Sequence, residues 1–129
     1  MKLHLIIIFT LFAFGLSAQV DITPQVTTAL SKGDSKAVSS YFATNIDLTL
    51  PDQEDMFSKE EASKLVSAFF IKHPSKSFEV KHRGTSKLND HYRIGDLITT
   101  AGTFRVTFFM RKEGESFKIS QFRIEDAEE

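Results

Sequence analysis

The alternation of apolar and polar residues from position 92 to position 124 constrains the fold of this chain more than any other feature. Three segments carry it, at 92–100, 103–112 and 116–124. In the middle segment apolar side chains recur at every second position, which places them on one face of a strand. These residues are Phe104, Val106, Phe108 and Met110. The pattern predicts a three-stranded antiparallel meander with one buried face.

Two glycine-containing turns determine the register that we expect for this meander. Two-residue loops at Ala101-Gly102 and Glu113-Gly114 fix which residues lie opposite each other. On this register, neighbouring strands place three polar side chains around the apolar face of the middle strand. They are Arg93, Gln121 and Arg123. A slip of one residue at either turn would move the side chains of a strand to the other face.

The first eighteen residues have the pattern of a secretory signal peptide. Lys2 and His4 form a short basic start, residues 5–16 are almost wholly apolar, and small Ala18 precedes polar Gln19. We therefore expect cleavage after Ala18. The apolar run is shorter than the ~20 residues that span a bilayer, so we expect no membrane anchor after cleavage. The chain has no cysteine, and a secreted domain without disulfides favours the bacterial periplasm.

Residues 19–129 have the size of a single domain. The chain has 16 basic and 17 acidic residues. Because Lys2 is removed with the signal peptide, 15 basic residues remain (16 − 1) and the net charge is about −2. Basic and acidic residues are mixed along the sequence. This balance argues against nucleic acid or an anionic membrane surface as a partner, because both attract clustered Lys and Arg.

Helical periodicity and capping residues predict the remaining elements. A first amphipathic helix is expected at 21–33 and ends at Gly33, and a second begins at Asp34 or Ser35. Ser58 and Glu61 form a capping box that opens a third helix, which Pro74 ends. Strands are expected at 45–50, briefly at Met56-Phe57, and at 77–85. The predicted order is helix, helix, strand, short strand, helix and four strands.

This order, together with the C-terminal hairpin at 104–112 and 117–125, resembles the nuclear transport factor 2-like superfamily, in particular its small secreted bacterial members of unknown function. The resemblance implies a single α+β domain in which N-terminal helices pack on a strongly curved, mainly antiparallel sheet, forming a cone. The superfamily hosts isomerases, dehydratases, transport adaptors and binding modules, so the fold by itself does not indicate a function.

Steroid isomerases of the superfamily use an Asp base opposite a Tyr and a protonated acid. The nearest counterparts here are Asp47, Tyr41 and Asp96, and none matches that pattern. Asp47 alternates with apolar residues, as expected of a solvated strand face. Tyr41 fits the core with its hydroxyl at the surface, and Asp96 fits a cross-strand contact with Thr107. We assign no catalytic residue.

The polar residues near the apolar face can be interpreted as the lining of a small-molecule pocket. His82 continues the alternating face of Phe78 and Val80, so we expect it to line a pocket together with the following residues: Arg93, Gln121 and Arg123. The ligand would be anionic or carry a carbonyl group. The alternatives are a hydrogen-bonded core histidine, a wet strand end, and an ion pair between Arg123 and an acidic residue elsewhere in the fold.

Metal and cofactor sites are not indicated by the sequence. The histidines do not show the close helical spacing of zinc sites, and no glycine-rich phosphate loop or nucleophile motif is present. His73 fits the end of a helix, and His91 has no assigned role. We therefore expect a non-catalytic periplasmic binding or interaction domain that forms a homodimer through its sheet. A small pocket enzyme and an accessory module of an envelope complex are the alternatives.

Overall fold

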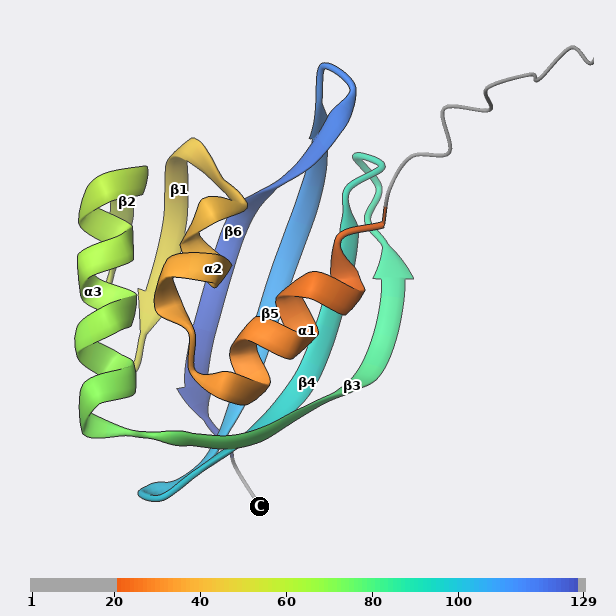
Figure 1. Cartoon of the computed structure of the whole chain (residues 1–129). Helices are drawn as coiled ribbons and strands as arrows, with labels where there is room; N and C mark the ends of the chain where they lie inside the picture. Colours follow the sequence, from red (N-terminus) through yellow and green to blue (C-terminus); the bar gives the residue numbers. More distant parts are fainter. Residues whose placement is uncertain (1–20, 128–129) are drawn as a thin grey trace, which may run out of the picture.

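The computed structural model of this chain describes residues 21–127, which form three helices and a six-stranded sheet (Figure 1). The predicted signal peptide, residues 1–18, lies outside the described residues. The element order is the predicted one. The helices are α1 (Thr23–Lys32), α2 (Ser35–Ser40) and α3 (Lys59–Lys72), and the strands are β1 (Phe42–Leu50), β2 (Gln53–Ser58), β3 (Ser75–Thr85), β4 (His91–Thr99), β5 (Gly102–Glu113) and β6 (Ser116–Asp126).

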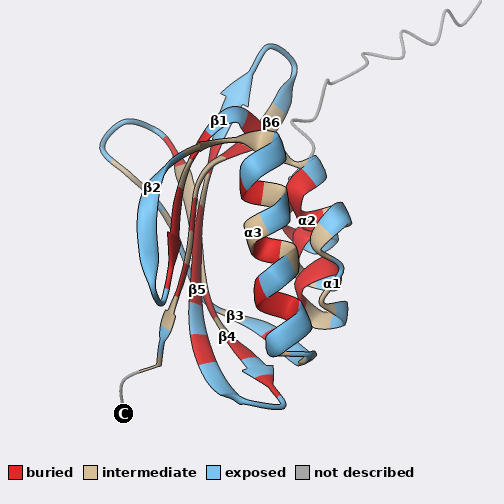
Figure 2. Cartoon of the chain, turned by 90° about the vertical axis from the view of Figure 1, so that its left-hand side faces the viewer, coloured by how far each residue is buried: buried red, intermediate tan, exposed pale blue. Residues whose placement is uncertain are grey.

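The sheet has the strand order β2-β1-β6-β5-β4-β3. Neighbouring strands are antiparallel except β1 and β6, which are parallel. All three helices cover the same face of the curved sheet (Figure 2). We call this face, which carries Leu97, Val106 and Phe108, the helical face. The opposite face, which carries Phe109 and Gln121, is the open face.

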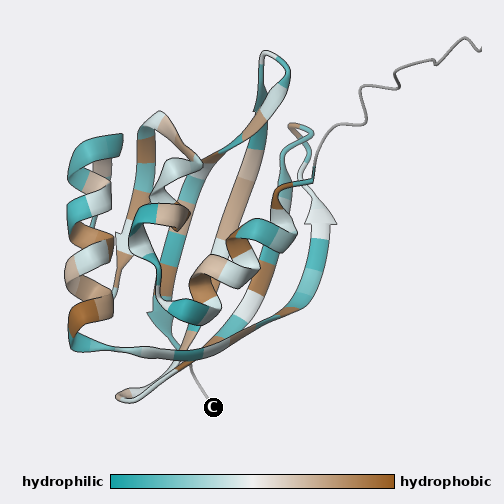
Figure 3. Cartoon of the chain, viewed as in Figure 1, coloured by the Kyte–Doolittle hydropathy of each residue, from teal (hydrophilic) through white to brown (hydrophobic). Residues whose placement is uncertain are grey.

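The core lies between the helices and the helical face. Phe108, Phe122 and Phe42 are its largest fully buried side chains, and the rings of Phe42 and Phe122 lie 5.5 Å apart. Burial of each such side chain stabilises the fold by about 1.5–3 kcal/mol. Hydrophobic and hydrophilic residues alternate along the helices and strands, as Figure 3 shows. Within residues 21–127, no helix is long and apolar enough to cross a membrane.

The helix ends confirm the predicted capping residues. Gly33 ends α1 in the left-handed conformation at φ 66°, where a side chain would be strained. The Asp34 carboxylate accepts a hydrogen bond from the Ala37 amide at the start of α2. The Ser58 hydroxyl accepts one from the Glu61 amide at the start of α3, at 3.2 Å. His73 is the C-terminal cap of α3, as expected.

The predicted register of the meander is wrong by two residues at both hairpins. The loops are Thr100-Ala101 and Gly114-Glu115, so Phe104 lies opposite Leu97 instead of Thr99. Asp96 consequently lies opposite Arg105, and its predicted contact with Thr107 is not formed. A shift of two residues preserves the faces of a strand. For this reason Arg93 remains on the helical face, opposite Phe108.

A β-bulge in β6 reverses the predicted faces of Gln121 and Arg123. Ser120 has no opposite residue on β5, because the register shifts between the pairs Met110–Ile119 and Phe109–Gln121. An extra residue in one strand turns all following side chains over. Gln121 and Arg123 therefore lie on the open face, while Phe122 and Ile124 are fully buried in the core. The prediction that Gln121 and Arg123 border the apolar face was wrong.

A second β-bulge, on the edge strand β3, moves the side chain of His82 to the open face. Lys81 has no opposite residue on β4, so Val80 pairs with Gly95 and His82 with Ile94. His82 is exposed on the open face. The prediction that His82 continues the face of Phe78 was therefore wrong. Bulges and lysines on an edge strand also obstruct pairing with another sheet.

Candidate functional site

The four residues predicted to line one pocket do not come together. Gln121, Arg123 and His82 lie on the open face, and only Arg93 projects from the helical face. Arg123 pairs with Glu125 on its own strand, with Nε 3.3 Å from Oε1, whereas the predicted alternative was an acidic residue elsewhere in the fold. That contact lacks hydrogen-bond geometry, so Arg123 Nε has no hydrogen-bond partner among the described residues.

The three residues compared with the steroid isomerase site are also separated. Asp47 and Asp96 lie on the open face, paired with Gln121 and Arg105 respectively. Tyr41 caps the end of α2 and packs partly buried against the core. The described residues contain no group of His, Cys, Asp and Glu side chains that could hold a metal ion.

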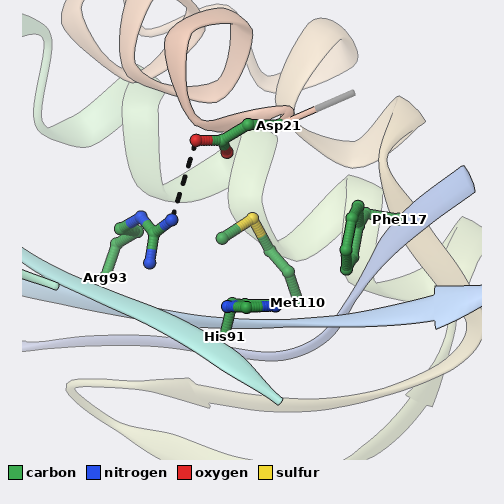
Figure 4. A pocket seen from close by; sticks show the side chains of 5 residues that line it. All are labelled: Asp21, His91, Arg93, Met110 and Phe117. Carbon is green, nitrogen blue, oxygen red and sulfur yellow. Dashed lines mark ion pairs between the residues drawn. The ribbon is translucent and has the colours of Figure 1, made fainter. Parts of the chain in front are cut away.

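Arg93 instead borders a pocket at the end of the helical face, beyond the start of α1. The pocket has a volume of about 170 Å³. Figure 4 shows Arg93 and Asp21 facing each other on one side and Phe117 on the other. The five lining residues come from the segment before α1 and from the strands β4, β5 and β6. They are Asp21, His91, Arg93, Met110 and Phe117. We call this site the Arg93 pocket.

The guanidinium of Arg93 is held by two hydrogen bonds and one loose ion pair. Its Nε donates to the hydroxyl of Thr23 at 3.1 Å, and its Nη1 donates to the carbonyl of Tyr92 at 2.9 Å. Its Nη2 lies 3.7 Å from the Asp21 carboxylate, which is beyond hydrogen-bond length. The Arg93 side chain is only 11% exposed. The Arg93 side chain is thus largely buried, but Nη2 is not among the fully buried atoms without a partner. Among the described residues this nitrogen makes no hydrogen bond, and it lies at the open pocket.

Thr23 at the start of α1 connects Arg93 with Asp21. It is almost fully buried, accepts the hydrogen bond from Arg93, and donates its hydroxyl and its backbone amide to Asp21 Oδ1. Partial burial raises the pKa of the Asp21 carboxyl, but these hydrogen bonds and the charges of Arg93 and Arg83 lower it by more. The pKa of Asp21 consequently lies below its ordinary value, and this carboxylate is ionised at neutral pH.

The remaining walls of the pocket are apolar and aromatic. Met110 is buried, and the ring of Phe117 meets the ring of His91 edge to face at a centroid distance of 5.5 Å. His91 lies opposite Met110 across β4 and β5. The pocket therefore combines one guanidinium and one carboxylate with an apolar wall. Such a wall with a few placed polar groups is a feature of small-molecule sites, which usually have volumes of about 300–1,000 Å³. A pocket of about 170 Å³ therefore admits only a small ligand.

Sequence reasoning missed Asp21, His91 and the pocket walls. Asp21 was assigned to the first helix, whereas it precedes α1 and faces β4. His91 and Arg93 are two residues apart on one strand, so they share a face with apolar neighbours. That spacing was the available indication of a polar site on this face.

A larger groove lies at the opposite end of the fold, between the end of α3 and the strand ends. It has a volume of about 480 Å³ and contains Phe69, His73 and Phe104. The ring of His73 stacks on Phe69 at 4.4 Å, and its Nδ1 lies 2.9 Å from the Phe69 carbonyl. His73 is thus used to end the helix. We consider the Arg93 pocket the better candidate because it places an arginine and an aspartate, held in a loose ion pair, beside an apolar wall.

The architecture defines the class of protein: three helices on one face of a strongly curved six-stranded sheet form a nuclear transport factor 2-like cone. Two solved structures show the same fold. A designed NTF2 protein matches with a TM-score of 0.60 and 14% identity, over 80% of this chain and 92% of that chain. A cystatin-fold protein from Novosphingobium aromaticivorans matches with a TM-score of 0.55 and 18% identity, over 78% and 92% of the two chains.

The chain belongs to the DUF4783 family, a domain of unknown function, whose model matches residues 23–125. A crystal structure of a DUF4783 family protein from Bacteroides uniformis is similar to this chain, with 31% identity and a TM-score of 0.77. The similarity covers 84% of this chain and 100% of that chain. A search of functionally curated proteins found no match.

Proposed function

We propose that this protein is a non-catalytic binding module of the bacterial periplasm, and that the Arg93 pocket binds a small organic molecule through a carboxylate group. The single observation that carries the proposal is the state of Arg93. Its side chain is 11% exposed, yet within residues 21–127 Nη2 has only an ion-pair contact, at 3.7 Å from Asp21 Oδ2. Nη2 is therefore a charged donor that is accessible from the pocket and available to a ligand.

Guanidinium chemistry indicates the kind of ligand. Arginine offers a planar fork of donors that matches a carboxylate with two parallel hydrogen bonds. Arg83 lies directly opposite Arg93 on β3 and adds a second positive charge near the pocket. The apolar wall of Met110 and Phe117 favours a short hydrocarbon group attached to that carboxylate.

The location in the periplasm rests on the sequence of residues 1–18 and on the absence of cysteine. The DUF4783 relative comes from a bacterium, Bacteroides uniformis, which supports only the bacterial part of this proposal. The N-terminal sequence of the protein purified from a bacterial host tests it. Secretion predicts a mature chain that starts at Gln19, and a chain that retains Met1 in the cytoplasm would contradict it.

Binding can be tested by isothermal titration with 3-methylbutanoate, a carboxylate with a small apolar group. We expect saturable binding that Arg93→Gln weakens at least ten-fold. Arg105→Gln is the matched control, because Arg105 is an exposed arginine on the open face. Equal affinity of the Arg93→Gln variant and the unchanged protein would contradict the proposal.

A second part of the proposal concerns the open face, which none of the helices α1, α2 and α3 covers (Figure 2). Tyr92 and Phe109 form an aromatic pair there, with ring centroids 5.5 Å apart. We propose that a second copy of the chain packs against the open face, since aromatic groups on a sheet face that the helices leave uncovered favour an isologous interface.

Sedimentation tests the dimer directly. Phe109→Glu is expected to give a monomer, because it places a charge in the centre of the proposed interface. Ile71→Glu on α3 is the control, because Ile71 is 77% exposed on the side of the helices. An unchanged protein that sediments as a monomer at high concentration would contradict the dimer and leave the pocket proposal unaffected.

A further inference from the structure

We infer that the ligand of the Arg93 pocket is a free α-amino acid with a small apolar side chain. This inference rests on the proposed function of the pocket and specifies its ligand. It derives from the positions of two opposite charges, Arg93 and Asp21, on one side of the pocket (Figure 4).

The two charges lie close together, but neither fully satisfies the other. A hydrogen-bonded ion pair has its nitrogen and oxygen about 2.7–2.9 Å apart, whereas Arg93 Nη2 and Asp21 Oδ2 are separated by 3.7 Å. Both hydrogen bonds from Thr23 go to the other oxygen of Asp21, Oδ1. As far as residues 21–127 are concerned, Nη2 of Arg93 and Oδ2 of Asp21 therefore remain available at neighbouring positions.

An α-amino acid carries the complementary pair of groups on a single carbon atom. Its carboxylate would accept hydrogen bonds from Arg93, and its ammonium group would donate to Oδ2 of Asp21. A simple carboxylate leaves Asp21 without a partner and is repelled by its charge. A simple amine lacks the group that Arg93 requires. Arg83, opposite Arg93, strengthens the positive side of the site on which the carboxylate would lie.

The size and the wall of the pocket limit the side chain. About 170 Å³ corresponds to roughly six water molecules at ~30 Å³ each. Met110 and Phe117 offer an apolar surface beside the two charges. A branched aliphatic side chain such as that of valine fits this combination, whereas a large aromatic or charged side chain does not.

Three probes that differ by one group test the inference by calorimetry on the purified protein. L-valine has both charges, 3-methylbutanoate lacks the ammonium group, and isobutylamine lacks the carboxylate. We expect L-valine to bind at least ten-fold more tightly than either of the others. Asp21→Asn should remove this preference by weakening L-valine about ten-fold while leaving 3-methylbutanoate unchanged or tighter. Asp52→Asn, an exposed change in the groove at the other end of the fold, should alter nothing.

The outcomes separate this inference from the proposed function. If 3-methylbutanoate binds the unchanged protein as tightly as L-valine, the amino acid inference is overturned and carboxylate binding stands. If none of the probes binds, both are overturned. The comparison of probes on the unchanged protein decides the matter even where Asp21→Asn proves unstable.

Discussion

Arg83 lies directly opposite Arg93 in the β3–β4 ladder, and both side chains project from the helical face. Like charges directly opposite each other destabilise a sheet. Asp21, in the segment that leads into α1, is the carboxylate whose pKa both arginines lower. The segment before α1 thus places one negative charge near two arginines of the sheet. Because Asp21 and Arg93 are only loosely paired, a ligand can bind to Arg93 beside Asp21 or in its place.

The stability of the protein should depend on Asp21 in acid. Because the pKa of Asp21 is lower in the folded chain than its ordinary value of 3.8, the ionised group stabilises the fold above that value. This contribution is lost as the pH falls below 3.8 through the lower folded pKa. The side chain is 50% exposed, so solvent screening keeps the effect within the ~1 kcal/mol of a surface ion pair.

Urea unfolding of the unchanged protein and of Asp21→Asn checks this dependence. The stability difference between them should be constant from pH 7 to pH 5 and should shrink as the pH falls below 3.8. A difference that grows on acidification would show that the pKa of Asp21 is raised instead.

Gly95 on β4 should tolerate no side chain. A Cβ at this position would lie 2.4 Å from the Glu79 carbonyl oxygen and 2.6 Å from the ring of Phe78. Phe78 is buried and the carbonyl belongs to the backbone, so neither can move freely. Gly95→Ala is expected to cost about 1–3 kcal/mol of unfolding free energy.

Gly84→Ala is the matched control for Gly95→Ala. At Gly84 the atoms within 3 Å of a Cβ belong to the outer end of the Tyr92 side chain, which can rotate away. Chemical denaturation should show a clearly smaller loss for Gly84→Ala. Equal losses at the two positions would contradict the packing described for Phe78.

The bulge at Ser120 should be essential to the fold. Deletion of Ser120 would turn Gln121 and Arg123 toward the core and Phe122 toward solvent. Each fully buried aromatic ring lost from the core costs about 3–5 kcal/mol, so we expect the deletion variant to be unfolded by circular dichroism. Ser120→Ala, which keeps the extra residue, should remain folded. A folded deletion variant would mean that β6 can reach the same register without the bulge.

The hydroxyl of Ser58 should stabilise α3. It accepts a hydrogen bond from the Glu61 amide at the first turn, and loss of such a cap costs about 1 kcal/mol. Ser58→Ala should therefore lower the unfolding free energy by about that amount, whereas Ser58→Asp should retain most of it. A Ser58→Ala variant as stable as the unchanged protein would show that this cap does not contribute.

The order of the elements could be predicted because local patterns encode it. Alternation marks the strands, and Gly33 and Ser58 mark helix ends through their own conformations and hydrogen bonds. Which side chains of β6 and β3 point toward the core could not be predicted. Serine at position 120 and lysine at position 81 are not residue types that require a β-bulge. Phe122 and Ile124 are fully buried, and they reach the core only because Ser120 is an additional residue in β6. The position of this bulge follows from packing of the strand against the helices.

The candidate site was predicted only in part for the same reason. Arg93 keeps its predicted face because the register error at β4 was two residues. Gln121, Arg123 and His82 lost theirs because one bulge precedes each segment. Asp21 and Phe117 approach Arg93 from segments about 70 and 25 positions away in the sequence, and only tertiary packing places them there.

Methionine methyl groups allow the most direct measurement of the central claim. Met110 lines the Arg93 pocket, and Met56 is 59% exposed on the distant strand β2. In a sample labelled at the methionine methyl carbons, L-valine or 3-methylbutanoate should shift the NMR signal of Met110, leave that of Met56 in place, and have no effect on the Arg93→Gln variant. If neither compound moves the Met110 signal, or if Met110 still responds in the Arg93→Gln variant, Arg93 does not bind a carboxylate in this pocket.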